Sequence, residues 1–170
     1  MAIDLIEGRL TFSFADECDA TAYDRWAFVR NQYQSVCGST KAVDFLCIDG
    51  GVLWVIEVKD YRLPRTPKPS NLSMMVARKV RDSIAGLVAA QCNANDPHEQ
   101  QFAQNALRAT QLRVVLHVEQ PQKISKLFPR AVDPGDLKSK IKKLLKAIDA
   151  HPEIVDQNSL KANMNWTVAG

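Results

Sequence analysis

The sequence predicts an α/β domain in which helices flank a mixed β-sheet, and a central hairpin is the strongest sign of it. Residues 42–48 and 52–58 are two runs rich in β-branched residues, separated by Asp49-Gly50-Gly51. Glycines supply the positive φ angles that tight hairpin turns require. Both runs are apolar on both faces, which is typical of strands covered on both sides. Helical patterns before and after the hairpin complete the α/β assignment.

The remaining elements follow from local signals along the chain. Asp96-Pro97 and Asp133-Pro134 each place a capping aspartate before a proline at the first helical position, so both predict helix starts. In chain order, the sequence predicts an edge strand over 9–14, a helix over 21–36, the hairpin, a proline-rich loop over 62–69, helices over 73–91 and 97–110, a strand over 112–118, a helix over 134–150 and a terminal strand over 166–168.

The length and composition are those of one globular domain spanning residues 1–170. No apolar run approaches the roughly 20 residues that a membrane-spanning helix needs, so no membrane partner is expected. The first residues lack the basic-then-apolar pattern of a secretory signal and the four cysteines contain no Cys-x-x-Cys pair, so we expect no secretory signal and a cytoplasmic protein. The net charge of +3 neither demands nor excludes a nucleic-acid partner.

The hairpin carries three charged residues that are unusual in such an apolar environment. Side chains alternate along a strand, so Glu57 and Lys59 share one face. If Gly50-Gly51 form the turn, Asp44 lies directly opposite Glu57, and if Asp49-Gly50 form it, the two are diagonal neighbours. Either register brings the three side chains within roughly 4.5–8 Å.

This arrangement predicts a metal-dependent site. Asp44 and Glu57 would repel each other, and Lys59 compensates only one of the two charges. A divalent cation between the carboxylates would restore the balance, polarise a phosphodiester and lower the pKa of bound water. Lys59 would orient that water or stabilise the developing charge. The alternative is an unrelated α/β fold with a structural salt bridge, for which a sheet without parallel pairing beside the hairpin would argue.

The stretch from Gly38-Ser39 through Asp44 to Glu57-Val58-Lys59 resembles the PD-(D/E)xK, or restriction-endonuclease-like, nuclease superfamily, and within it the archaeal Holliday-junction resolvases. The resemblance implies a restriction-endonuclease-like sandwich with Asp44 and Glu57 as metal ligands, joined by the Val58 carbonyl, and with Lys59 as the catalytic lysine. It also implies Mg²⁺ or Mn²⁺ as the cofactor. Further candidates by this resemblance are Ser39, Asp24 and Glu17.

Basic residues after the catalytic strand are the candidates for contacts with a nucleic-acid backbone. They are Arg62, Arg65, Lys68, Arg78 and Lys79. The predicted late helix is also basic on one face, which fits either a solvated surface or a phosphate-binding one: Lys138, Lys140, Lys142, Lys143 and Lys146.

Together these observations predict a Mg²⁺-dependent endo- or exonuclease that hydrolyses DNA phosphodiester bonds. As partners we expect DNA, and either a second copy of the chain or a larger DNA-processing or defence system. The alternative is a non-catalytic nucleic-acid- or protein-binding module on the same fold.

Overall fold

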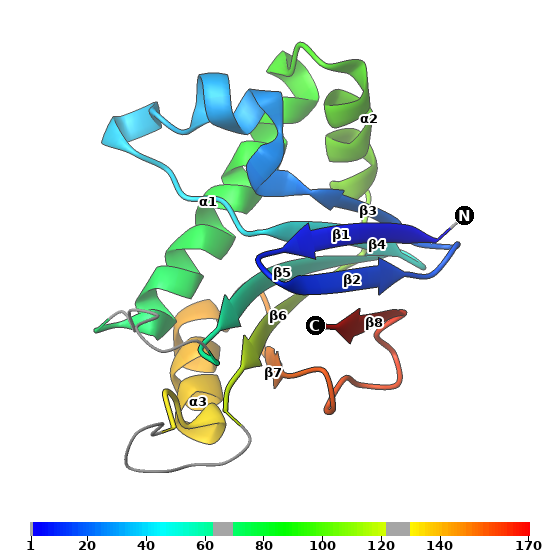
Figure 1. The fold of residues 1–170 in the computed structure, drawn as a ribbon. Helices are drawn as coiled ribbons and strands as arrows, with labels where there is room; N and C mark the ends of the chain where they lie inside the picture. Colours follow the sequence, from blue (N-terminus) through cyan, green and yellow to red (C-terminus); the bar gives the residue numbers. More distant parts are fainter. Residues whose placement is uncertain (1, 63–69, 122–129) are drawn as a thin grey trace.

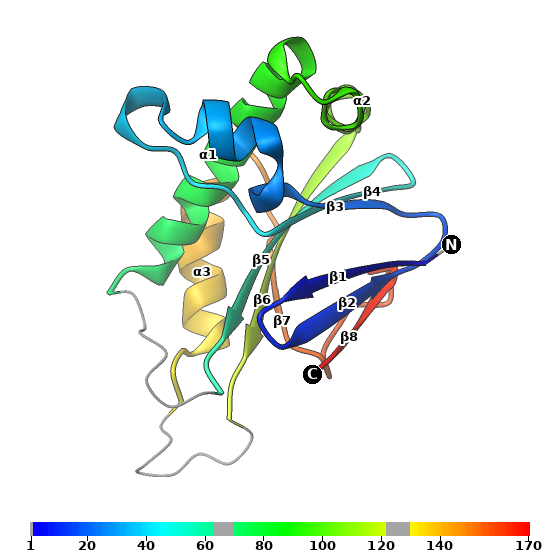
Figure 2. The ribbon, with the colours of Figure 1, turned by 45° about the horizontal axis from the view of Figure 1, so that its top comes forward.

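Two β-sheets face each other, and helices cover the outer side of the larger sheet (Figures 1 and 2). This arrangement comes from a computed structural model, which describes residues 2–62, 70–121 and 130–170. One apolar core lies between the helices and the larger sheet, and a second lies between the two sheets. The predicted α/β class is confirmed.

The larger sheet is mixed, with the strand order β3-β4-β5-β6-β7. Its strands are β3 (Asp19–Ala22), β4 (Phe45–Asp49), β5 (Val52–Asp60), β6 (Gln111–Glu119) and β7 (Glu153–Val155). The first three are antiparallel, whereas β6 pairs in parallel with both β5 and β7. The hairpin therefore has a parallel neighbour, and the condition that would have favoured the structural alternative is not met.

The hairpin register is the first of the two alternatives. Asp49 pairs with Val52, and the two turn glycines have φ angles of 53° and 84°. These positive angles match the tight turn whose twist suits a hairpin. The register places the residue before Phe45, which is Asp44, opposite Glu57.

The smaller sheet was not predicted as a separate layer. It consists of β1 (Ile3–Glu7), β2 (Leu10–Phe14) and β8 (Trp166–Ala169), all antiparallel, in the order β1-β2-β8. Along β2 the buried residues alternate with half-buried Thr11 and Ser13, as expected for a strand with one covered face. Phe14 and Trp166 reach the larger sheet, where Phe14 packs on Phe45 with ring centroids 6.4 Å apart and Trp166 packs on Trp54 with ring centroids 5.3 Å apart. Helices therefore flank only one face of the hairpin, which corrects the prediction.

Three α-helices are described: α1 (Leu72–Asn93), α2 (Pro97–Ala106) and α3 (Pro134–Leu145). The two predicted aspartate caps are confirmed, since Asp96 accepts a hydrogen bond from His98 N and Asp133 accepts one from Asp136 N, both at 2.8 Å. Within the described ranges, none of the helices combines the length and the apolar character needed to cross a membrane.

The predicted helix over 21–36 is only partly present. Residues 19–22 form the edge strand β3, and three short helical segments follow in place of one long helix: the 3₁₀ helix η1 (Tyr23–Arg25), the π-helix η2 (Val29–Tyr33) and the 3₁₀ helix η3 (Val36–Gly38). The winding that leads into η2 starts where the carboxylate of Glu99 accepts hydrogen bonds from Ala27 N at 2.6 Å and Phe28 N at 3.0 Å. Cys37, with a φ of 51°, ends the regular winding. These contacts come from α2, far along the chain, and local periodicity carries no sign of them.

Gly86 of α1 is expected to tolerate no larger side chain. A Cβ atom there would lie 2.2 Å from the Tyr23 hydroxyl and 2.9 Å from Tyr33 Cε1. Glycine-to-alanine exchange normally stabilises a helix interior by about 1 kcal/mol, but overpacking here should make Gly86→Ala less stable by about 1–3 kcal/mol in urea unfolding. The loss should be smaller in a Tyr23→Phe background, and an unchanged loss would show that the hydroxyl is not the obstacle.

Candidate metal centre

Asp44 and Glu57 lie side by side under α1, as the hairpin predicted. Asp44 comes directly before β4 and is 7% exposed, whereas Glu57 lies within β5 and is 1% exposed. One Asp44 oxygen, Oδ2, accepts a hydrogen bond of 2.6 Å from Val58 N. The peptide of the neighbouring strand therefore orients the Asp44 carboxylate and leaves its other oxygen for further contacts.

Two lysines, rather than one, compensate this carboxylate pair. Lys79 extends from α1, and its Nζ donates to both Glu57 oxygens at 2.7 and 2.8 Å and lies 3.6 Å from Asp44 Oδ1. Lys59 Nζ donates to Glu57 Oε1 at 2.5 Å and to the Val58 carbonyl at 3.0 Å. The predicted charge imbalance between Asp44 and Glu57 therefore does not exist. The sequence predicted Lys79 to contact nucleic acid. Its contact with Glu57 could not be predicted, because that contact depends on how α1 packs against β5.

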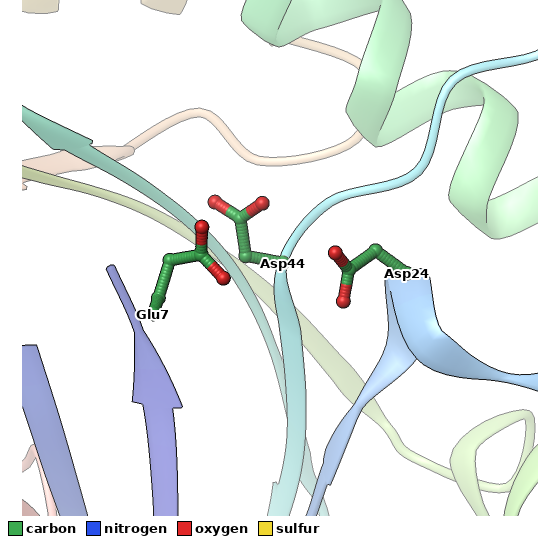
Figure 3. A group of neighbouring side chains, drawn as sticks. All are labelled: Glu7, Asp24 and Asp44. Carbon is green, nitrogen blue, oxygen red and sulfur yellow. The ribbon is translucent and has the colours of Figure 1, made fainter.

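Two further carboxylates join Asp44 and create a new acidic group. Glu7 at the end of β1, Asp24 in η1 and Asp44 each bring one oxygen within 4.8 Å of the others. Figure 3 shows the three side chains converging from three separate segments. Asp24 Oδ1 is buried and has no hydrogen-bond partner among the described residues. Buried oxygens of this kind call for an explanation such as an ion or ordered water.

The charges of this region favour a hard divalent cation. Four carboxylates (Glu7, Asp24, Asp44 and Glu57) meet two lysines and Arg25, which lies 3.7 Å from Glu7, and this leaves a formal charge of −1. Burial, and then the charge of Asp44, raises the pKa values of Glu7 and Asp24 above the usual range of carboxyls. The same two causes raise the pKa of Glu57 to about 7. All the available ligand atoms are carboxylate oxygens, which is the donor type that Mg²⁺ and Mn²⁺ prefer.

Polar side chains of α1 fix the backbone that leads into Asp44. Asp82 Oδ2 accepts a hydrogen bond from Lys41 N, and Ser83 Oγ accepts one from Val43 N, both at 3.0 Å. The Asp44 carbonyl accepts a 2.9 Å bond from Tyr23 N, next to Asp24. Two of the three converging carboxylates are therefore linked through their own backbones.

The other predicted site residues lie apart from the acidic group. Glu17 and Ser39 are exposed, and the Val58 carbonyl already accepts a bond from Lys59. Arg78 is exposed on α1. Arg65 and Lys68 lie outside the described residues. Glu7 was missed, because the strand that carries it was not predicted.

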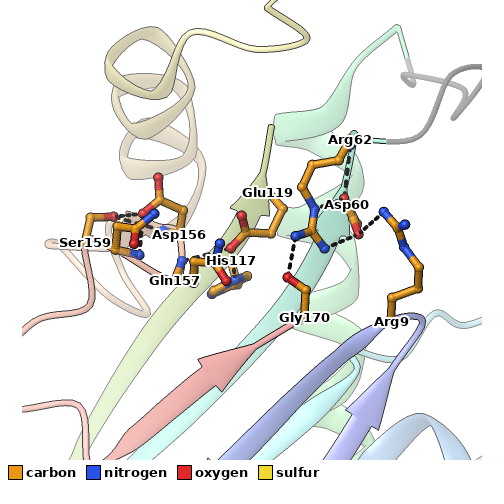
Figure 4. Close-up of polar contacts among 10 residues, drawn as sticks. Arg9, Asp60, Arg62, His117, Glu119, Asp156, Gln157, Ser159 and Gly170 are labelled. Carbon is orange, nitrogen blue, oxygen red and sulfur yellow. Dashed lines mark hydrogen bonds and ion pairs between the residues drawn. The ribbon is translucent and has the colours of Figure 1, made fainter. Parts of the chain in front are cut away.

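Arg62 takes part in a different polar cluster, between the two sheets (Figure 4). Its guanidinium donates to both Asp60 oxygens at 2.9 and 2.7 Å and to the Gly170 carbonyl at 2.7 Å. Nearby, His117 Nε2 and Glu119 Oε1 are 2.9 Å apart, and both residues are buried. Burial lowers the pKa of His117. Arg62 therefore joins β5 to the C-terminal strand, a structural contact that its predicted phosphate contact would have to break.

Glu57→Gln should stabilise the protein in the absence of metal. The pKa of Glu57 is raised from 4.5 in the unfolded chain to about 7 in the folded protein, so the protein loses stability as the pH rises between these two values. Above pH 7 the full cost of burying the ionised carboxylate applies. Removing it should add about 1–3 kcal/mol to the free energy of unfolding at pH 8 and much less at pH 5. Urea unfolding with EDTA measures this, and exposed Glu17→Gln is the matched control. A clear loss of stability in Glu57→Gln would mean that its bonds to the lysines outweigh the penalty.

Comparison with known proteins shows a similarity between this chain and part of a tRNA ligase. The chain is 34% identical over 163 residues to the cysteine–tRNA ligase of Neisseria meningitidis serogroup A / serotype 4A (strain DSM 15465 / Z2491), and the match covers 78% of this chain. It covers only 23% of the ligase, so the chain spans less than a quarter of the relative's length. No family model and no solved structure matches the chain.

This similarity corrects the functional prediction. A relative that joins cysteine to tRNA overturns the assignment to the PD-(D/E)xK nuclease superfamily, together with the DNA-hydrolysing activity and the DNA partner. The resemblance covered about 25 residues around Asp44 and Glu57, whereas the match to the ligase covers 78% of the chain. The physical argument for a cation between those two carboxylates also fails, because Lys79 occupies that role.

Proposed function

We propose that this chain is a tRNA-contacting domain that holds a divalent cation, Mg²⁺ or Mn²⁺, and serves a process related to tRNA aminoacylation. The observation that carries the proposal is the convergence of Glu7, Asp24 and Asp44 within 4.8 Å, beside the lysine-bound Glu57. The tRNA partner is suggested by the similarity to a segment of a cysteine–tRNA ligase. We also propose that residues 1–170 act as one domain, because β4, β5 and β6 contribute to both cores.

Some residues of the site would hold the ion, and others would balance the charge of the neighbouring carboxylates. Glu7, Asp24 and Asp44 would hold the cation, and Asp24 Oδ1 would gain the partner that the described residues do not provide. Mg²⁺ in such sites keeps several waters and binds phosphate oxygens, so it supplies a positive charge to which an RNA backbone can attach. Lys79 keeps Glu57 neutralised, and Lys59, whose side chain is 23% exposed, can approach a phosphate at the rim.

Binding of a fluorescein-labelled tRNA transcript, followed by anisotropy, tests this function. The protein should bind the transcript more tightly in Mg²⁺ than in EDTA, by at least about tenfold, since removal of the cation leaves an acidic surface that repels phosphate. Asp24→Asn should lose the Mg²⁺ dependence, whereas Glu17→Gln should keep it. Binding that is equal in Mg²⁺ and EDTA would contradict the proposal.

The state of the RNA after binding is a second check. The transcript should be recovered at full length after incubation with Mg²⁺ or Mn²⁺, as seen on a denaturing gel. Metal-dependent cleavage that disappears in Lys59→Ala would contradict a binding role and show that the site is hydrolytic.

A further inference from the structure

The positive charge of the chain is concentrated in one short segment around α3. Residues 130–147 contain six basic and two acidic residues, a formal net charge of +4. The whole chain has a net charge of +3, so all the other residues together amount to −1. This segment therefore carries a local positive charge to which a polyanion would be attracted.

Packing of α3 fixes these lysines on one outward face. Leu137, Ile141 and Leu145 are buried in the core beside α1. Lys142 and Lys146 lie four residues apart, on neighbouring turns of the opposite side, and both are exposed. Lys138 is paired with Glu153 at 2.8 Å and Lys140 with Asp136 at 2.7 Å. Lys142, Lys143 and Lys146 form no ion pair with an acidic residue of the described ranges, so their charge is available to a partner.

A groove beside this face offers room for a ligand backbone. It has a volume of about 520 Å³ and lies between the first turn of α1 and α3. Lys140 and Lys143 line one side together with Asp133 and Asp136, and the polar residues Ser70, Asn71 and Ser73 line the other. Lys140 is paired with Asp136, so Lys143 is the lysine of the groove that has no acidic partner among the described residues. Figure 1 shows the start of α1 next to α3. Lysines opposite hydroxyl and amide groups are the side chains that commonly contact phosphate and sugar.

We propose that the outward face of α3 and the adjoining groove are a contact surface for the RNA sugar–phosphate backbone, separate from the acidic metal centre. This inference rests on the proposed tRNA partner. An anionic membrane is the less suitable partner, because a membrane-surface helix must insert its apolar side and α3 has its apolar side buried in the core. Leu144 is the exposed large apolar side chain of α3, and the other apolar residues that line the groove, Leu72, Met74, Val132 and Leu137, are buried or half-buried.

The test compares two double variants that remove the same charge from different places. Lys142→Gln/Lys146→Gln changes α3, and Arg108→Gln/Lys161→Gln removes two exposed cations elsewhere on the chain. Each protein is titrated with the fluorescein-labelled tRNA transcript in Mg²⁺ from 50 to 300 mM KCl. Removal of one lysine–phosphate contact should lower the slope of log affinity against log salt by about 1, so the slope of the α3 variant should fall by about 2 and that of the control should match the wild type.

Three outcomes would contradict either the proposed α3 contact surface or the proposed tRNA binding on which it rests. Equal slopes in the two double variants would overturn the α3 surface alone and leave the tRNA-binding domain in place. No tRNA binding by the wild type would overturn both proposals. Binding of vesicles containing phosphatidylserine that is abolished in the α3 variant, without any change in tRNA binding, would reassign the surface to a membrane and overturn the RNA contact.

Discussion

Lys79→Met is expected to lower the free energy of unfolding by about 3 kcal/mol at pH 8, because it leaves a buried carboxylate with one cation fewer. Glu57 is 1% exposed, and both its oxygens accept bonds from Lys79. Burial alone lowers the pKa of Lys79, but the charges of Glu57 and Asp44 outweigh it and raise the pKa above its ordinary value. The lysine is therefore charged throughout the accessible pH range and stabilises Glu57 as an anion.

The pH dependence of this loss identifies its cause. Without Lys79 the pKa of Glu57 should rise further above about 7, so the carboxyl is protonated at pH 5.5 and the penalty largely disappears. Urea unfolding of Lys79→Met and the wild type at pH 5.5 and 8 measures the difference. Arg78→Met removes the exposed neighbouring cation and should change stability by less than about 0.5 kcal/mol. A Lys79→Met loss that is equal at both pH values would show that its cause is packing and not charge.

Asp44→Asn is expected to weaken divalent-cation binding by at least about 100-fold, which exceeds the usual effect of changing a residue that only supports a ligand. Asp44 is the carboxylate shared by the acidic group and the lysine-bound pair. An asparagine oxygen can still accept the bond from Val58 N, so the hairpin should remain folded. Isothermal titration with Mn²⁺ measures the affinity, and circular dichroism checks the fold.

Protons compete with the cation for the same oxygens. Burial raises the pKa values of Glu7 and Asp24, so these ligands take up protons at a higher pH than exposed carboxyls do. Affinity for Mn²⁺ should therefore fall between pH 8 and pH 5. Glu17→Gln should retain the wild-type affinity at each pH, and the same loss in this variant as in Asp44→Asn would show that the ion binds diffusely.

The hairpin and its charged residues could be predicted because their signals are local. The glycines limit the turn to two registers, both of which place Asp44 beside Glu57, and the structure has the register in which the two lie opposite each other. The capping aspartates of α2 and α3 could be predicted for the same reason, since each accepts a hydrogen bond from a backbone N–H two or three positions further along the chain.

The rest of the site depends on contacts between distant segments. Glu7 reaches Asp44 only because β1 folds over the larger sheet. β1 has five residues and is only partly buried, so it has no strong apolar pattern that would predict it. Lys79 lies on a helix surface where a basic residue normally faces solvent, and only the packing of α1 on β5 turns it toward Glu57. For this reason Lys79 was assigned to another role and Glu7 was missed, whereas Asp24 was named as a candidate only through the family resemblance.

Binding of Mn²⁺ followed by electron paramagnetic resonance tests the central claim most directly, because it detects the ion itself. The claim predicts one tightly bound Mn²⁺ per chain, displaced by excess Mg²⁺ and absent in Asp44→Asn. A wild-type protein that leaves all the Mn²⁺ free would contradict it, and the convergence of Glu7, Asp24 and Asp44 would then be a charge cluster without an ion.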